Sequence, residues 1–66
     1  MIETFGQRLK RIRKEQDLKQ VELAKKSGLL RNQIICYERD ANEPTVSRIE
    51  WLCKALNVTA SELLGF

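Results

Sequence analysis

The sequence predicts an all-α protein built from five short helices. Apolar residues recur at helical spacing in one segment after another, and no segment shows the strict apolar–polar alternation that is typical of a strand. Sixty-six residues are also too few for two hydrophobic cores. We therefore expect one all-α domain over residues 1–66.

The first two helices are predicted over residues 4–16 and about 20–26. The apolar face of the first helix consists of Phe5, Leu9 and Ile12. Basic side chains occupy its opposite face, as expected for an amphipathic surface helix. The second helix is followed by Gly28, which can adopt a positive φ without strain and so predicts a tight turn.

A third helix is predicted over about 31–39, directly after this turn. A helical wheel places three apolar residues on one side, which we expect to be buried: Leu30, Ile34 and Tyr37. The residues predicted to point outward are Asn32, Ile35, Cys36 and Arg39, flanked by Arg31 and Gln33. This outward face therefore combines amides, guanidinium groups and small apolar groups.

A loop that ends at Pro44 leads into a fourth helix, predicted over about 46–56 with Thr45 as its N-cap. The residues of this helix expected to face inward are Val46, Ile49, Cys53 and Leu56. A short fifth helix should follow, because Thr59 and Glu62 have the spacing of a capping box.

Charge is distributed unevenly along the chain, whose net charge is +3. Residues 1–39 contain ten bases and five acids, a net of +5, whereas residues 40–66 contain two bases and four acids, a net of −2. A basic half predicts an anionic partner, although a solvated helix face would have a similar composition.

The sequence contains no pattern of a metal site or of an exported protein. Its two cysteines, Cys36 and Cys53, are far apart and there is no histidine, so we expect no metal and no cofactor. No signal peptide is recognisable, and no apolar run approaches the ~20 residues that cross a bilayer. We expect a cytoplasmic protein that makes no contact with membranes.

The outward face of the third predicted helix carries the kinds of side chain that read base edges in the DNA major groove, although an ordinary surface helix could carry the same set. Arginine binds guanine, asparagine and glutamine bind adenine, and apolar groups contact the methyl group of thymine. The preceding segment has the spacing of a helix-turn-helix, with a small residue at Ala24 and a turn at Gly28. In that motif the second helix enters the major groove.

Four segments in register resemble the phage repressor and Cro-like (XRE-type) helix-turn-helix family. These segments are "LKQVELAKKSGL", "IICYERD", "EPTVSRIEWLCKALNV" and "SELL", and the resemblance spans about 60 of the 66 residues. It implies a compact five-helix, lambda-repressor-like DNA-binding fold with its helix-turn-helix at residues 20–39. It also implies a sequence-specific transcriptional regulator, in a family that includes the controller proteins of restriction–modification systems.

The resemblance further implies roles for individual residues. By this comparison the base-reading residues are Arg31, Asn32, Gln33 and Cys36. The residues that meet DNA phosphates are Lys19, Gln20 and Arg39, and Gln20 also braces the recognition helix. Arg13 and Glu38 resemble an ion pair that ties the first helix to the end of the third.

The sequence departs from the family pattern at several positions. Lys19 and Leu30 replace the usual Ser or Thr caps, and each lost cap should cost roughly 1 kcal/mol. Leu30 could instead contact a thymine methyl or pack on the core. Asp40 stands where glycine is common, and Cys36 cannot make the bidentate contact of a glutamine.

The C-terminal half is the surface available for a homodimer, because the basic half must face double-stranded DNA. The predicted interface residues are Trp51, Val58 and Phe66, although Trp51 could instead lie against the C-terminal helix. No histidine, glycine-rich phosphate loop or paired carboxylates suggest an enzyme, and no small-molecule ligand is expected. The alternative is a protein-interaction module, such as an antitoxin or a bridging factor.

Overall fold

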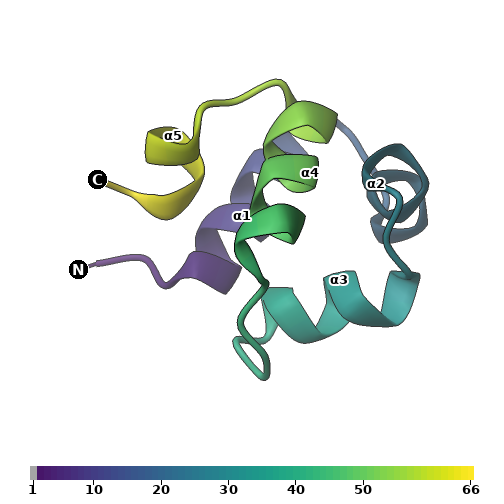
Figure 1. The fold of residues 1–66 in the computed structure, drawn as a ribbon, viewed down its shortest axis with the longest axis horizontal. Coiled ribbons are helices and arrows are strands. Elements are labelled where there is room, and N and C mark those ends of the chain that lie inside the picture. The colour runs from purple at the N-terminus through teal and green to yellow at the C-terminus, as the bar shows by residue number, and fades with distance from the viewer. Residues whose placement is uncertain (1) are drawn as a thin grey trace.

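The computed structural model describes residues 2–66 and contains five α-helices. They are α1 (Phe5–Glu15), α2 (Gln20–Ser27), α3 (Arg31–Glu38), α4 (Val46–Leu56) and α5 (Ala60–Leu64). No strand is present between residues 2 and 66. The all-α prediction is confirmed: α1 to α4 begin and end within two residues of their predicted bounds, and α5 follows Thr59 as expected. In Figure 1, α4 crosses in front of α1, with α2 on one side, α5 on the other and α3 below.

Three helices begin at a threonine whose hydroxyl accepts a hydrogen bond from a backbone N–H of the first turn. These N-caps are Thr4, Thr45 and Thr59. Thr45 accepts from the N–H of Arg48 at 3.3 Å, as predicted. Such a bond satisfies one of the N–H groups that have no partner inside a helix.

One hydrophobic core joins all five helices. Its buried side chains are Leu9, Ile12, Leu23, Ala24, Leu29, Ile34, Tyr37, Leu52, Leu56 and Leu63. Most of the apolar residues predicted to face inward belong to it or pack against it. Leu52, which the sequence had not placed, is fully buried and lies with Leu56 at the centre of the inner face of α4.

Two predictions of burial were wrong. Leu30 is 69% exposed, because it is the N-cap of α3 and has an extended backbone (φ −90°, ψ 149°), so the helical wheel does not describe its direction. Val46 is 73% exposed because it is the first residue of α4 and lies off the inner face of that helix.

The left-handed turn predicted at Gly28 is present, with φ at 76°. Asp40 also adopts a left-handed conformation, with φ at 59°, where the family resemblance leads one to expect glycine. Aspartate tolerates this region better than most side chains. The chain therefore turns sharply at both ends of α3, and this helix remains short and lies at the edge of the molecule (Figure 1).

Candidate nucleic-acid interface

The interface is built on α3, which packs its inner side against the core and leaves its outer side open. Ile34 and Tyr37 are buried, and Ala24 of α2 is buried against the same core. On the outer side, Arg31 and Asn32 are exposed, whereas Cys36 is half-buried. The structure thus places the side chains predicted to read bases on one helix, with Arg31 and Asn32 exposed.

The C-terminal end of α3 is tied to α1 by an ion pair between Arg13 and Glu38. Arg13 Nε donates to Glu38 Oε2 at 2.6 Å, and Arg13 Nη2 donates to Glu38 Oε1 at 3.0 Å. The two side chains are only 8% and 3% exposed. Because buried charges are costly unless paired, loss of either partner leaves an uncompensated charge inside the protein.

Gln20 and Leu18 complete this network. Gln20 Nε2 donates to Glu38 Oε1 at 3.1 Å, and Arg13 Nη1 donates to the backbone carbonyl of Leu18 at 2.7 Å. Gln20 is the first residue of α2, so the start of α2 and the end of α3 share one carboxylate. The network holds α3 at a fixed angle to α2.

A second link joins the end of α3 to the start of α1, and the sequence did not predict it. The carboxylate of Asp40 accepts a hydrogen bond from the Thr4 hydroxyl at 2.6 Å and another from the Gly6 N–H at 2.9 Å. These bonds, that of Thr4 first, lower the pKa of Asp40 below its usual value. The only signal in the sequence was an aspartate at a position where glycine is common.

Gly6 allows the two helices to approach closely at this point. A Cβ atom at residue 6 would lie 2.5 Å from the carbonyl oxygen of Tyr37 and 2.7 Å from that of Glu38. Both neighbours are backbone atoms, which cannot move aside as a flexible side chain could. A side chain at residue 6 would therefore push α1 away from α3.

The N-termini of α2 and α3 have no side-chain cap, as predicted, but each keeps the reciprocal bond of a capping box. The side chains of Lys19 and Leu30 accept no hydrogen bond, but the backbone N–H of Lys19 donates to Glu22 Oε1 at 2.7 Å. In the same way, the N–H of Leu30 donates to Gln33 Oε1 at 2.9 Å. Half of each capping box is therefore present. Gln33 Oε1 accepts this bond with one of its two lone pairs, and both N–H groups of the Gln33 amide have no partner among residues 2–66.

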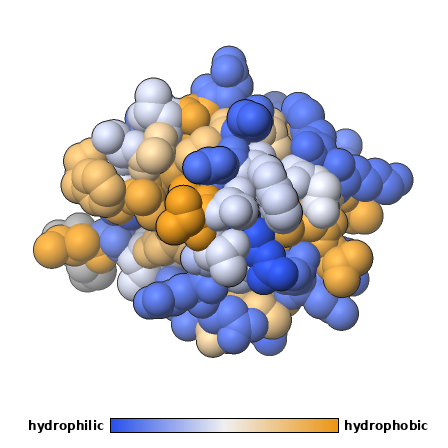
Figure 2. All heavy atoms as spheres, viewed as in Figure 1, coloured by the Kyte–Doolittle hydropathy of each residue, from blue (hydrophilic) through white to orange (hydrophobic). Residues whose placement is uncertain are grey.

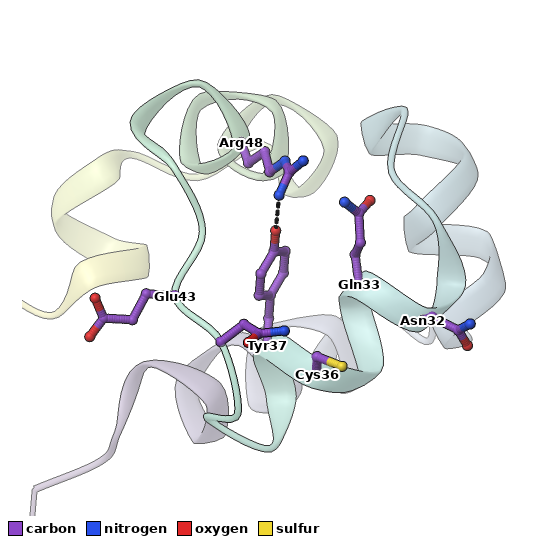
Figure 3. A pocket seen from close by; sticks show the side chains of 7 residues that line it. Asn32, Gln33, Cys36, Tyr37, Glu43 and Arg48 are labelled. Carbon is purple, nitrogen blue, oxygen red and sulfur yellow. Dashed lines mark hydrogen bonds between the residues drawn. The ribbon is translucent and has the colours of Figure 1, made fainter.

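A shallow hollow opens between α3 and the start of α4. It is lined by Asn32, Gln33, Cys36, Tyr37, Asn42, Glu43 and Arg48 (Figure 3). In this view Tyr37 and Gln33 extend toward α4, whereas Asn32 extends away from it. Arg48 Nη1 donates to the Tyr37 hydroxyl at 3.0 Å. Sequence reasoning missed Arg48, whose only signal was its position as one of two bases after residue 39.

The residues predicted to form a dimer interface differ in exposure. Trp51 is 44% exposed and Phe66 is 86% exposed, whereas Val58 is half-buried and packs against the core. Val58 thus has a partial role in the core, which the sequence analysis did not assign to it. Figure 2 shows apolar surface concentrated on the α5 side of the molecule and mainly hydrophilic surface toward α2 and α3.

Other chemistry is limited among residues 2–66. Cys36 and Cys53 are both free thiols, and burial, followed by the charge of Glu50, raises the pKa of the Cys53 thiol. Across the same range there is no cluster of metal-ligating side chains. None of the five helices is long and apolar enough to cross a membrane.

Residues 9–63 match the helix-turn-helix family, and the chain belongs to this family. The geometry agrees with the match, since α2, the turn at Gly28 and α3 form the motif for which the family is named.

The proteins similar to the chain include two solved structures and one curated relative. The restriction–modification controller protein C.AhdI from Aeromonas hydrophila has a TM-score of 0.90 and 36% identity, with 92% of each chain covered. The P22 c2 repressor, in complex with synthetic operator 9T, has a TM-score of 0.89 and 30% identity, with 96% of each chain covered. The immunity repressor protein of Bacillus phage phi105 is 44% identical over 62 residues, which are 94% of this chain and 43% of the relative. The chain thus spans less than half the length of that relative.

Proposed function

We propose that this protein is a sequence-specific DNA-binding transcriptional regulator whose helix α3 enters the major groove of double-stranded DNA. The observation that carries the proposal is the contrast between the two sides of α3. Its inner side is held by the core and by the Arg13–Glu38 ion pair, and its outer side presents Arg31 and Asn32 to solvent. A rigid helix with exposed hydrogen-bonding side chains is what base recognition requires.

The proposed base contacts follow from the chemistry of the side chains. Arg31 can donate two hydrogen bonds to guanine, and Asn32 can both donate to and accept from adenine. Cys36 is small and half-buried, so its contribution to base discrimination is weak. The Oε1 of Gln33 already accepts the N–H of Leu30, so we propose that the Gln33 N–H groups make its main contact, to an acceptor such as guanine O6 or a phosphate.

Phosphate contacts are proposed for Lys19, Gln20 and Arg39. Lys19 and Arg39 are exposed, and each lies at one end of a motif helix. Gln20 gives one amide hydrogen to Glu38, which leaves its second N–H for a phosphate oxygen. Such contacts position the protein on the duplex but carry no sequence information.

The similarity to a controller protein and to a repressor solved with its operator supports this proposal. We propose binding as the role of this domain and assign it no catalytic residue. A regulator of this kind acts on DNA in the cytoplasm.

We further propose that the protein binds as a homodimer through its C-terminal surface. One helix-turn-helix reads only a few base pairs, so a useful specificity ratio requires two half-sites. A two-fold dimer would place its recognition helices about 34 Å apart and would read a pseudo-palindrome. The interface residues proposed for it are Trp51 and Phe66, with Val58 at their border.

Trp51→Ala tests the dimer. We expect the variant to sediment as a monomer at concentrations where the wild type is a dimer, and to bind the operator more weakly with the same base preferences. Glu43→Ala, an exposed change in the loop before α4, is the control for the sedimentation measurement and should leave the dimer intact. A wild-type protein that is monomeric at tens of micromolar and binds DNA as independent single copies would contradict the dimer.

Selection from random-sequence double-stranded DNA tests the function itself. The purified protein should enrich one motif with two related half-sites, centred about 10 base pairs apart. Enrichment of no motif, at any salt concentration that permits binding, would contradict the proposal and would leave a protein-interaction role for the domain.

A further inference from the structure

We propose that Leu30 contacts the C5-methyl group of a thymine, and that it thereby adds a third base to the recognition by Arg31 and Asn32. This inference rests on the proposed function, because it assumes that α3 binds in the major groove. It assigns to the operator a thymine in each half-site at the base pair that faces the start of α3.

The first observation is the exposure of Leu30. Its side chain is 69% exposed, although leucine is among the residues most often buried. It lies immediately before Arg31, at the end of α3 where the exposed reading residues are found. The core is therefore not the partner of this side chain, and its place in the chain makes it continuous with the proposed DNA interface.

The second observation is that the backbone of Leu30 is held on both sides. Its N–H donates to Gln33 Oε1 at 2.9 Å, and its carbonyl oxygen accepts from the N–H of Gln33 at 3.0 Å and from that of Ile34 at 3.2 Å. An exposed side chain on a fixed backbone is ordered at a smaller entropic cost on binding than one on a mobile loop. Gln33 is thus a positioning residue for Leu30.

The chemistry of the major groove identifies the partner. Among the four bases only thymine presents an apolar group there, the methyl group at C5. Leucine has no hydrogen-bonding side-chain atom, so it cannot recognise the donors and acceptors of the other bases. The apolar contact distinguishes thymine from cytosine and also from uracil, which differs from thymine only by this methyl group.

Replacement of thymine by deoxyuridine tests the contact without altering any hydrogen bond of the base pair. Each thymine of the selected operator is replaced in turn, and the Kd of the wild type is measured by titration at fixed salt. At one position in each half-site we expect the affinity to fall roughly fourfold per methyl group, the factor that corresponds to burial of one such group. Leu30→Ala should bind the thymine operator more weakly by a similar factor and should bind the thymine and uracil operators equally at that position.

Two matched variants separate Leu30 from other apolar residues. Val46 is equally exposed but lies on α4, and Val46→Ala should keep the full difference between thymine and uracil. Cys36→Ala, on the outer side of α3, should also keep it. Thermal unfolding of Leu30→Ala should match that of the wild type, because the side chain has no place in the core.

Failure of the proposed function and failure of the Leu30 proposal give different experimental results. If the protein selects no DNA motif, the proposed function fails. If it selects a motif but no uracil substitution lowers its affinity, or if Leu30→Ala retains the same sensitivity to uracil, DNA binding stands and the role of Leu30 is overturned. Loss of that sensitivity in Cys36→Ala or Val46→Ala would also overturn it and would assign the methyl contact to that residue.

Discussion

The two ends of α3 are built in opposite ways. The C-terminal end is fixed by a buried carboxylate, Glu38, which binds side chains from α1 and α2. Asp40, two residues later, adds a link to the start of α1. Among residues 2–66 the N-terminal end has no side-chain link of this kind to another helix, and its only side-chain cap is the bond from the Leu30 N–H to Gln33 Oε1. One end thus sets the position of the helix, and the other leaves its side chains free for a partner.

This difference between the two ends of α3 explains how a domain of this size can fix the orientation of the proposed recognition helix. Buried polar networks are costly to form but keep elements in one arrangement when every member is satisfied. In residues 2–66 no buried side-chain polar atom lacks a hydrogen-bond partner. The network therefore stabilises the angle between α2 and α3 without using any side chain from the exposed end of α3.

Glu38→Ala should have the largest effect on stability, because it removes the carboxylate that ties the C-terminal end of α3 to α1 and α2. Removal of one partner of a buried ion pair costs about 3–5 kcal/mol, and here the change leaves the Arg13 guanidinium buried without a counter-charge. Chemical denaturation should show this loss in the free energy of unfolding. Glu43→Ala, at an exposed glutamate, is the control and should stay within about 0.5 kcal/mol of the wild type. Equal free energies of unfolding for the two variants would contradict the claim that the Glu38 network fixes the C-terminal end of α3.

Arg31→Ala should have the next largest effect, and it should act on binding while leaving folding intact. Loss of a bidentate contact to guanine costs about 1–3 kcal/mol and relaxes the preference at one base pair in each half-site. Titrations against the operator and its single-base variants measure both quantities. An equal loss on every sequence would make Arg31 a phosphate contact.

Lys19→Ala should produce a smaller and less selective effect. Lys19 precedes α2, so its loss should weaken binding to operator and random DNA alike. The slope of log affinity against log salt should become shallower by roughly one unit, because one fewer phosphate is neutralised. An unchanged slope would remove Lys19 from the phosphate contacts.

Asp40→Asn should produce the smallest effect and one that depends on pH. The lowered pKa means that the charged carboxylate stabilises the folded state above its usual pKa of about 3.9, and that this contribution is lost as the pH falls through the lower folded value. Unfolding measurements should thus find the variant slightly less stable than the wild type at pH 7, with a difference in stability that shrinks as the pH falls below the usual pKa of an aspartate. Asparagine tolerates the left-handed conformation, so the backbone is unaffected. A gap that does not change with pH would exclude the carboxylate charge as its cause.

The sequence predicted the features of the fold that depend on local signals, and it missed those that depend on long-range contacts. Helical periodicity, the capping threonines and Gly28 are local signals, and they placed all five helices correctly. The residues that the prediction misplaced lie at helix starts, where Leu30 and Val46 do not follow the wheel of the helix interior.

The contacts that were missed join residues far apart in the chain. The bonds of Asp40 to Thr4 and Gly6 span 36 and 34 residues, and that of Tyr37 to Arg48 spans 11. No local pattern encodes such pairs, since each depends on how the helices pack. The Arg13–Glu38 ion pair was anticipated only because the chain resembles a known family.

The most direct test of the account is the ratio of the Kd for random DNA to the Kd for the selected operator, measured at one salt concentration. For the wild type we expect a ratio of roughly 1,000 or more. For a variant in which Arg31 and Asn32 are both alanine, we expect the ratio to fall by a factor of 10 or more while the Kd for random DNA changes little. A double variant that keeps the wild-type ratio would contradict the claim that the free end of α3 reads the bases.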